Sequence, residues 1–382
     1  MIISQLTPRF KPSIGGIEVL VFETSKFLVN NGHSVKVFTS KLTGMYEQKT
    51  KRNEIIDGIQ IKRSLSFPLL PIKGGMLNVM PRMLIDVLKD KSDIYHSYGA
   101  GSFPSIVGHL KKKQKKPVVL TPLLYSTTEG KTAQNLIDKL SKNILNSADK
   151  LIAQTKSEKE YLESLGINKD KIEIIPLYAN PERFSKYKIS SEEFRKKYSL
   201  NHFVILYVGR IEIWQKGLNF LIDALAKIKK NFKVTLVISG EDWGSKEQLV
   251  KQARKLNVIE NLKFFDPKDE RSLGEAYHAA DLLVLPSNFE PFGTVLVEAM
   301  CCGTPVIGTK VGGIVDVISN EKTGKIVPPK DSDSLANAIS EILGDEQKKK
   351  QFGENGILKM QDYSVSVLGK KYLKIYSDLL QK

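Results

Sequence analysis

Two glutamates at a fixed spacing are the strongest candidates for a chemical role in this chain. Glu290 and Glu298 are eight positions apart in NFEPFGTVLVEAM, residues 288–300, which follows the apolar run DLLVLP. Gly293 lets backbone approach a ligand, and the N–H groups that begin a helix favour an anion such as phosphate. A carboxylate on each side of that anion site can accept hydrogen bonds from hydroxyl groups. The alternative is that Glu298 is a solvated helix residue and Glu290 caps the helix.

Two cations follow another apolar run. Arg210 and Lys216 lie in YVGRIEIWQKG, residues 207–217, directly after the predicted strand HFVILYV. A guanidinium gives two hydrogen bonds and an ammonium acts as a compact charge, so together they can hold a diphosphate. Alone this signal is weak, because the chain has 58 lysines and arginines. Trp214 and Trp243, in loops on the same side, either stack a base or cover apolar surface.

Alternating strands and helices position these residues in the second half. We expect strands over 202–208, 233–239, 261–265, 281–286, 304–308 and 324–327, and helices over 216–230, 246–256, 271–279, 293–302 and 332–343. Strands that alternate with helices form a parallel sheet covered on both faces. Such sheets bind ligands outside the carboxyl ends of their strands.

The first half has the same rhythm. We expect strands over 1–3, 34–39, 93–96, 117–120, 150–154 and 171–176. The glycine pair Gly15–Gly16 opens the first helix, which runs through Asn31. This pair could bind a phosphate at the helix start, although a lone glycine pair is more often only a turn. The fold class is therefore α/β, with two doubly wound Rossmann-like domains facing across a cleft. The domains are 1–180 and 181–363, with 177–200 as linker, and a C-terminal helix in 364–382 could return to the first domain.

Composition excludes several classes of protein. The chain has 382 residues, 41% of them hydrophobic, which is typical of a globular protein of two domains. The two cysteines are adjacent, so neither a disulfide framework nor a metal site with CxxC spacing is expected. The Asp331–Asp333 pair fits helix capping better than metal binding. No apolar run is long enough to span a membrane, and a reducing, cytoplasmic setting is the simplest interpretation.

Positive charge is concentrated in the first half. Residues 1–190 hold 30 Lys+Arg against 17 Asp+Glu, or +13 of the net +16. An anionic partner or a merely lysine-rich surface both fit this excess. The run KKKQKK, residues 111–116, and the apolar segment 66–88 suit peripheral docking on an anionic membrane, at the inner face of the cell membrane. No aromatic residue adjoins KKKQKK, so no nucleic-acid partner is expected.

The motifs together resemble the retaining glycosyltransferases of family 4, which have the GT-B fold. The matching stretches, in order, are PSIGGIEV, FLVNNGHSVKVFTS, DIYHSYG, LYVGRIEIWQKGLNFLIDAL, DLLVLPSNFEPFGTVLVEAMCCGTPVIGT, VGGIVDVI and TGKIVPPKD. The stretch EPFGTVLVE is similar to the E-x7-E motif of that family. The resemblance covers nearly the whole chain.

The resemblance implies a role for each motif. Glu298 would hold the donor's ribose hydroxyls, Glu290 the transferred sugar, and Arg210 with Lys216 the departing diphosphate. The implied catalytic residues are Glu290, Arg210, Lys216 and His96. The implied donor-binding residues are Gly16, Arg210, Lys216, Glu290, Phe292, Gly293, Thr294, Val295 and Glu298. Neither a metal nor another cofactor is implied.

The resemblance also implies the reaction class. A hexose or N-acetylhexosamine would move, with retention of configuration, from a nucleotide diphosphate sugar to a hydroxyl of a lipid-linked or glycan acceptor. The product would be a cell-surface polysaccharide, glycolipid or glycoprotein glycan. UDP is slightly favoured over GDP as the donor nucleotide. A basic protein that only binds anionic surfaces is the alternative from another class.

The first half departs from the family at several positions. Members often have a histidine after the fifth strand, where this chain has Leu123 in LTPLLYS, and Tyr98 stands where a second histidine is common. Leucine cannot donate a hydrogen bond to a substrate, although Tyr125 could partly replace the histidine. A degenerate, non-catalytic member is therefore a further alternative. His96 itself fits either a substrate contact or a buried histidine at a strand end.

Overall fold

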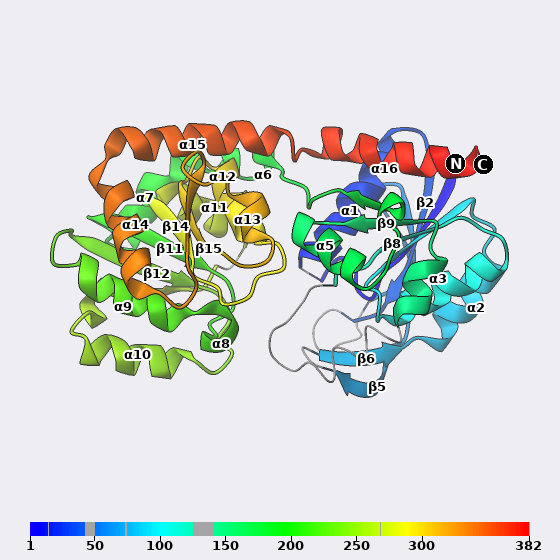
Figure 1. Cartoon of the computed structure of the whole chain (residues 1–382), viewed down its shortest axis with the longest axis horizontal. Coiled ribbons are helices and arrows are strands. Elements are labelled where there is room, and N and C mark those ends of the chain that lie inside the picture. The colour runs from blue at the N-terminus through cyan, green and yellow to red at the C-terminus, as the bar shows by residue number, and fades with distance from the viewer. Residues whose placement is uncertain (14, 43–49, 73–74, 125–140, 268, 382) are drawn as a thin grey trace. The chain divides into compact units, whose positions relative to one another are not determined.

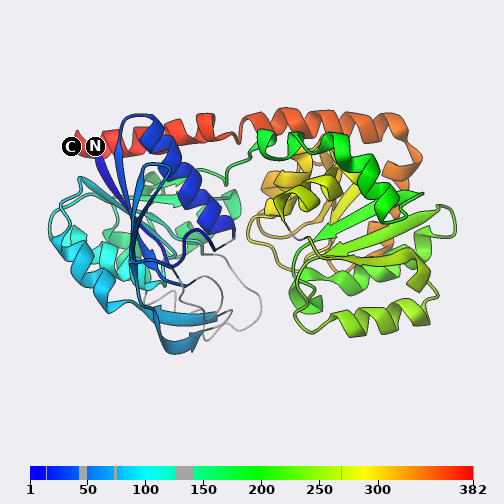
Figure 2. The ribbon, with the colours of Figure 1, turned by 180° about the vertical axis from the view of Figure 1, so that it is seen from behind.

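The chain divides into two compact units. In the computed structural model, which describes residues 1–13, 15–42, 50–72, 75–124, 141–267 and 269–381, unit 1 comprises Met1–Tyr178 and Val365–Lys382. Unit 2 comprises Ala179–Ser364. The C-terminal helix α16 (Val365–Leu380) thus belongs to unit 1, where it lies beside α1 (Gly16–Asn30) (Figures 1 and 2).

A mixed sheet forms the centre of unit 1. Its strands are β1 (Ile2–Leu6), β2 (Ser34–Ser40), β3 (Asn53–Ile56), β4 (Ile59–Ser64), β7 (Ile94–Tyr98), β8 (Val118–Thr121), β9 (Lys150–Ala153) and β10 (Ile172–Ile174). Their order is β10-β9-β8-β7-β1-β2-β4-β3, and all neighbours are parallel except the β3–β4 pair. β7 is buried throughout and β1 is buried except at Ile2, as expected for central strands that helices cover on both faces.

The remaining elements of unit 1 surround or extend that sheet. Besides α1 and α16 they are α2 (Pro81–Lys89), α3 (Phe103–Lys113), α5 (Lys156–Ser164), the 3₁₀ turn η1 (Lys169–Lys171), and the strands β5 (Phe67–Ile72) and β6 (Gly75–Val79). β5 and β6 pair only with each other, as a separate antiparallel hairpin. Figure 1 shows this hairpin at the margin of unit 1, beyond the ends of the larger sheet.

Unit 2 is a parallel sheet between helices. Its strands are β11 (Phe203–Val208), β12 (Val234–Ser239), β13 (Leu262–Phe265), β14 (Leu282–Leu285), β15 (Val306–Thr309) and β16 (Gly324–Val327), in the order β13-β12-β11-β14-β15-β16. Its helices are α6 (Pro181–Ser185), α7 (Ser191–Lys197), α8 (Ile213–Lys216), α9 (Leu218–Ile228), α10 (Lys246–Lys255), α11 (Glu270–Ala279), α12 (Thr294–Cys301), α13 (Ile314–Val317), α14 (Ser332–Gly344) and α15 (Glu346–Gln361), with 3₁₀ turns η2 (Lys188–Ser190) and η3 (Ile259–Asn261).

Each sheet has a point where the strand order reverses. In unit 2 the chain proceeds from β11 outward through β12 and β13, then returns to β14 on the other side of β11. In unit 1 the same reversal lies between β1 and β7. Loops that leave the carboxyl ends of the two strands at a reversal diverge, which opens a crevice where ligands bind in folds of this kind.

The predicted α/β fold with parallel sheets in two Rossmann-like halves is confirmed. The linker expected over 177–200 is wrong, because α6, η2 and α7 form there and α6 and α7 pack on α11 within unit 2. Charged residues and Pro181 suggested a linker, but Pro181 opens α6, a position where proline suits a helix. The sequence patterns did not predict the β3–β4 pair, the β5–β6 hairpin or α15.

None of the described helices is both long enough and apolar enough to cross a membrane.

Candidate active site

The loop after β11 brings the first predicted cations into place. Tyr207 donates a hydrogen bond from its hydroxyl to the Arg210 carbonyl at 2.8 Å, which fixes the backbone where the strand ends. Arg210 Nη2 then donates to Gln215 Oε1 at 2.7 Å, and its guanidinium lies 4.3 Å from the ring centre of Trp243. A guanidinium stacked on indole and held at one end stays in a defined orientation.

A glycine allows the second cation to reach the same edge of the sheet. Helix α8 is capped by Glu212, whose carboxylate accepts the Gln215 N–H, and it ends at Gly217 with φ 63°. A Cβ at Gly217 would overlap the carbonyl oxygen of Pro286, in the loop after β14. Any other residue would push the two loops apart, so Gly217 is what places Lys216 against the neighbouring loop.

Lys216 meets the first glutamate of the E-x7-E stretch. Its Nζ lies 2.7 Å from Glu290 Oε2, and only 11% and 12% of the two side chains are exposed. Ser287 Oγ donates to the same carboxylate oxygen at 3.4 Å. Two charges so far removed from water stabilise each other, and losing one partner leaves the other uncompensated.

A second glycine pair supports the Glu290 backbone. Gly313 donates its N–H to the Glu290 carbonyl at 3.0 Å. Gly312 has φ 45°, and a Cβ there would overlap the same carbonyl oxygen. The loop after β15 therefore packs backbone against backbone on the Glu290 loop, and the motif VGGIVDVI has a positioning role that the sequence analysis did not assign.

Helix α12 begins immediately after this loop. Phe292 is buried, Gly293 precedes the helix with φ 88°, and Thr294 and Val295 are half-buried in its first turn. The first turn of a helix presents N–H groups that favour an anion. The start of α12 and the pair Lys216–Glu290 therefore belong to the loops that follow β11 and β14, at the point where the strand order reverses.

Glu298, in the second turn of α12, is held by two groups from other helices. Tyr277 of α11 donates its hydroxyl to Glu298 Oε2 at 2.6 Å, and Arg183 Nη1 of α6 lies 3.3 Å from Oε1. Arg183 Nε also contacts Glu270 Oε2 at 2.9 Å. Burial raises the pKa of Glu298, while the Tyr277 hydrogen bond and the Arg183 charge act in the opposite direction.

This arrangement has a definite chemical capacity. Arg210, Lys216 and the start of α12 provide positive potential that suits a diphosphate. Glu298 has one lone pair of each oxygen engaged, so lone pairs remain to accept hydrogen bonds from a vicinal diol such as ribose. Glu290 is the second acceptor, beside Lys216.

Comparison with known proteins gives the family. Residues 14–183 match Glycosyltransferase Family 4, and residues 190–359 match Glycosyl transferases group 1. An uncharacterized glycosyltransferase of Methanocaldococcus jannaschii is 32% identical over 363 residues, covering 90% of each chain. The chain is a glycosyltransferase of family 4.

More distant relatives agree. The D-inositol 3-phosphate glycosyltransferase of Nocardia farcinica is 25% identical, covering 96% of this chain and 85% of its own. Among solved structures, sucrose-phosphate synthase from Thermosynechococcus elongatus has a TM-score of 0.84 at 24% identity, covering 100% of this chain and 99% of its own. Anabaena HepE in complex with UDP has a TM-score of 0.81 at 23% identity, covering 99% and 100%. These likenesses show the GT-B fold.

The structure brings most of the predicted donor residues of this glycosyltransferase to one edge of unit 2. Arg210 and Lys216 follow β11, and Glu290 precedes α12. The predicted residues Phe292, Gly293, Thr294, Val295 and Glu298 lie in or next to α12. Trp243 contacts Arg210, which neither earlier interpretation of that tryptophan included.

His96 does not fit the predicted catalytic role. The strand β7 continues to Tyr98, so His96 lies within the strand rather than at its end. It is fully buried, with Nδ1 2.6 Å from the Tyr376 hydroxyl and Nε2 2.9 Å from Thr121 Oγ1. A group enclosed in this way cannot contact a substrate, so the structure favours the buried-histidine alternative.

Replacing His96 tests that correction. Burial lowers the pKa of His96 from 6.5 to about 3, so the folded protein holds it neutral while the unfolded chain protonates below pH 6.5. Its contribution to stability is complete above pH 6.5 and is lost as the pH falls toward 3, about 2 kcal/mol by pH 5. We expect His96→Gln to lose less unfolding free energy than the wild type between pH 7 and pH 5 in urea titrations.

The same variant separates structure from catalysis. Because His96 touches no substrate, kcat/KM of folded His96→Gln should stay within about threefold of the wild type. A loss of a hundredfold or more, with an unchanged pH dependence of stability, would restore His96 to the catalytic residues.

Two other predicted features of unit 1 have structural counterparts. Gly16 begins α1 as expected, but the Glu18 carboxylate lies over Gly15 at the helix start, which is the place of the possible phosphate site.

Leu123, which stands where members of the family often have a histidine, has φ 58°, a conformation that costs a branched residue energy. Next to it, the buried Glu158 carboxylate accepts the N–H groups of Leu124 and Gln154 at 2.9 and 2.8 Å, and burial raises its pKa to about 7. Tyr125 lies outside the described residues.

Arg183 and Tyr277 are the site residues that the sequence analysis missed. Arg183 lies in the segment interpreted as linker, and Tyr277 has the spacing of a core residue in α11. Periodicity shows which face of a helix is buried, but not that a buried hydroxyl points at a carboxylate. The asparagine cap before Pro181 was the one available signal that a helix begins there.

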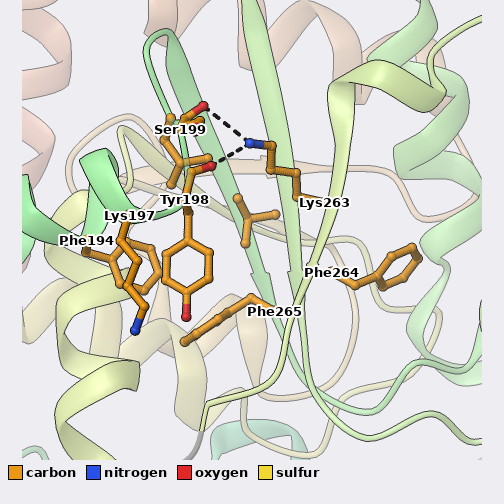
Figure 3. A pocket seen from close by; sticks show the side chains of 9 residues that line it. Phe194, Lys197, Tyr198, Ser199, Lys263, Phe264 and Phe265 are labelled. Atoms are coloured by element: carbon orange, nitrogen blue, oxygen red, sulfur yellow. Dashed lines mark hydrogen bonds between the residues drawn. The ribbon is translucent and has the colours of Figure 1, made fainter.

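Two further features lie apart from this edge. Asp331 caps α14 by accepting the Asp333 and Ser334 N–H groups, as predicted. A cavity of about 350 Å³ lies beside α7 and the strands β12 and β13, lined by Phe194, Tyr198, Lys263 and Phe265 among others (Figure 3). Its Lys263 donates to the Tyr198 and Ser199 carbonyls at the end of α7, so that cation is already engaged.

Proposed function

We propose that this glycosyltransferase moves a hexose or N-acetylhexosamine from a nucleotide diphosphate sugar, with UDP favoured over GDP, to an acceptor hydroxyl with retention of configuration. The observation that carries the proposal is the buried Lys216–Glu290 pair, with its Nζ–Oε2 distance of 2.7 Å, at the β11–β14 reversal beside Arg210 and the start of α12. UDP in the HepE complexes supports the choice of nucleotide.

Different residues of the site bind different parts of the donor. Glu298, positioned by Tyr277 and Arg183, accepts hydrogen bonds from the two ribose hydroxyls. Arg210 and Lys216 with the α12 N–H groups hold the diphosphate. Glu290 contacts hydroxyls of the transferred sugar and, through Lys216, ties sugar and phosphate recognition to one ion pair.

Catalysis in this proposal is electrostatic. The bond between the anomeric carbon and the diphosphate oxygen breaks as negative charge grows on the diphosphate, where Arg210 and Lys216 already stand. The acceptor oxygen bonds to the same face of the oxocarbenium-like centre, and its proton leaves to the departing phosphate oxygen. Because two cations and a helix start carry the charge, we propose that transfer needs neither a metal nor another cofactor.

The acceptor in this proposal is a glycan or a lipid-linked hydroxyl, in synthesis of a cell-surface polysaccharide, glycolipid or glycoprotein glycan. D-inositol 3-phosphate glycosyltransferases among the relatives support a hydroxyl-bearing acceptor of polar character. We further propose a cytoplasmic enzyme with peripheral contact to an anionic membrane.

A donor screen tests the proposal. Purified protein is incubated with UDP-, GDP- and ADP-sugars and lipid-linked acceptors, with and without EDTA, and release of nucleoside diphosphate is measured. Release from a UDP-sugar that survives EDTA, with a product of unchanged anomeric configuration by NMR, is the expected result. An inverted product or a strict metal requirement would refute those parts of the proposal. Tight UDP binding without transfer to any acceptor would favour the degenerate, non-catalytic alternative.

A further inference from the structure

The β5 strand of unit 1 exposes a row of large apolar side chains. Leu65, just before the strand, is 49% exposed, and Phe67 and Leu69 are 50% and 55% exposed. Ser66, between the first two, is buried at 4%. Leu65 precedes β5, and the pairing register of β5 shifts between Pro68 and Leu70, so strand alternation does not set the direction of these side chains. We call these three neighbouring exposed residues the apolar row. Leaving such a row in water is unfavourable, and contiguous apolar surface marks an interaction site.

Helix α2 extends that row. Met83 and Val87 are fully buried against the core of unit 1, while Ile85 and Leu88 are 42% and 38% exposed on the outer face. Phe67 pairs with Val79 in the hairpin, and α2 begins at Pro81, so Phe67 lies close to the start of the helix. Figures 1 and 2 show the hairpin and α2 on the same lower part of unit 1.

Cations accompany the apolar side chains. Arg82 and Lys89 are exposed at the two ends of the outer face of α2, and Lys62 is exposed on β4 before the row. Asp86 is the carboxylate on α2, and it pairs with Arg52 and Arg82 at 3.5 Å each. The surface therefore keeps a net positive charge, in the half of the chain that carries +13.

The basic run KKKQKK contributes less than its sequence suggests. Lys111 is 2% exposed and donates to the Asp90 carbonyl at 2.8 Å and the Leu88 carbonyl at 3.2 Å. Lys112 pairs with Asp149. These two lysines are engaged within unit 1, whereas Lys113 and Lys115 are exposed, so only part of the run is available to an anionic surface.

We propose that the docking surface made of Leu65, Phe67, Leu69, Arg82, Ile85, Leu88 and Lys89 binds an anionic lipid bilayer. Apolar side chains flanked by cations suit the boundary between headgroups and acyl chains, where both kinds of group are satisfied. A second copy of the chain is a poor occupant, because it would bring an equally positive surface into contact. Docking on a bilayer would bring the enzyme to a lipid-linked acceptor, and in this respect the inference rests on the proposed function. Its test does not depend on that function.

Vesicle co-sedimentation tests the docking surface without any donor or acceptor. We expect the full chain to sediment with vesicles of phosphatidylglycerol and phosphatidylcholine at low salt, and at least tenfold less with phosphatidylcholine alone or at about 0.5 M salt. Phe67→Ser with Leu69→Ser, and separately Arg82→Glu with Lys89→Glu, should each lower the bound fraction at least tenfold. The matched control is Leu358→Ser, since Leu358 is 60% exposed on α15 of unit 2; it should sediment like the wild type.

Two companion measurements keep the result interpretable. Thermal unfolding establishes that each variant is folded, and UDP titration establishes that unit 2 is intact, so failure of docking and failure of the donor site are distinguishable. Equal sedimentation of the wild type and both docking variants would overturn the proposal. So would sedimentation velocity showing a dimer that Phe67→Ser dissociates, because a second copy would then cover this surface.

Discussion

Replacing Lys216 with methionine is expected to lower kcat/KM of sugar transfer by about 10²–10³-fold. Methionine keeps the volume of the side chain but removes the charge that meets the departing diphosphate. It also leaves Glu290, 12% exposed, without its partner at 2.7 Å. The loss should appear mainly in kcat, because charge on the diphosphate is greatest in the transition state. Steady-state kinetics with the donor found in the screen measures it.

A double variant separates two effects of Lys216→Met: the loss of the cation and the loss of the ion-pair partner of Glu290. Lys216→Met with Glu290→Gln removes both charges, so its thermal stability should return toward the wild type while transfer stays low. Lys227→Met is the surface control, since Lys227 pairs with the exposed Asp333 on the outside of unit 2, and it should transfer normally. Recovery of transfer in the double variant would show that Lys216 serves only to neutralise Glu290.

Replacing Arg183 with glutamine is expected to weaken UDP binding about 30- to 100-fold at pH 7, equivalent to about 2–3 kcal/mol. Arg183 lies 3.3 Å from Glu298 Oε1 and opposes the burial that raises the pKa of this carboxyl. Without Arg183 one of the two groups that oppose the effect of burial is lost, so the pKa of Glu298 rises further and its deprotonated form is less favoured. A protonated carboxyl has fewer lone pairs free for the ribose hydroxyls.

The dependence on pH distinguishes this role from a structural one. In the proposed function Glu298 binds ribose in its deprotonated form, so affinity should fall as the pH drops through its pKa and recover as the pH rises. Arg183→Gln should therefore regain part of its affinity as the pH is raised, and Tyr277→Phe should shift in the same direction. Neighbouring Glu270 also loses its partner in this variant, so Glu270→Gln is the matched control. A profile parallel to the wild type would mean that Arg183 only holds α6 in place.

The donor half was predictable because its chemistry follows the strand order. Glu290, Arg210 and Lys216 each follow a short apolar run, and carboxyl ends of parallel strands share one edge. Spacing together with the family resemblance therefore placed these three residues at one site. The partners Arg183 and Tyr277 come from elements whose burial pattern says nothing about the direction of a single polar atom, and only coordinates relate them to Glu298.

The first half was harder to predict for a related reason. The run DIYH indicated a strand, but β7 continues through Ser97 and Tyr98, which are also buried. Because the strand is two residues longer than predicted, His96 lies inside it and is part of the core. There it contacts Tyr376 of α16, the last helix of the chain. The β3–β4 pair and the β5–β6 hairpin were missed because neither fits the alternation of strands with helices. Both interrupt a doubly wound pattern that is otherwise regular.

Calorimetric titration of UDP, GDP and ADP into the wild type and Glu298→Ala tests the central claim most directly, that the edge of unit 2 at the β11–β14 reversal is a nucleotide-sugar donor site. The account predicts that UDP binds the wild type more tightly than GDP or ADP, and that Glu298→Ala loses at least tenfold in affinity. Absence of binding by all three nucleotides, or equal UDP affinity in the variant, would contradict it.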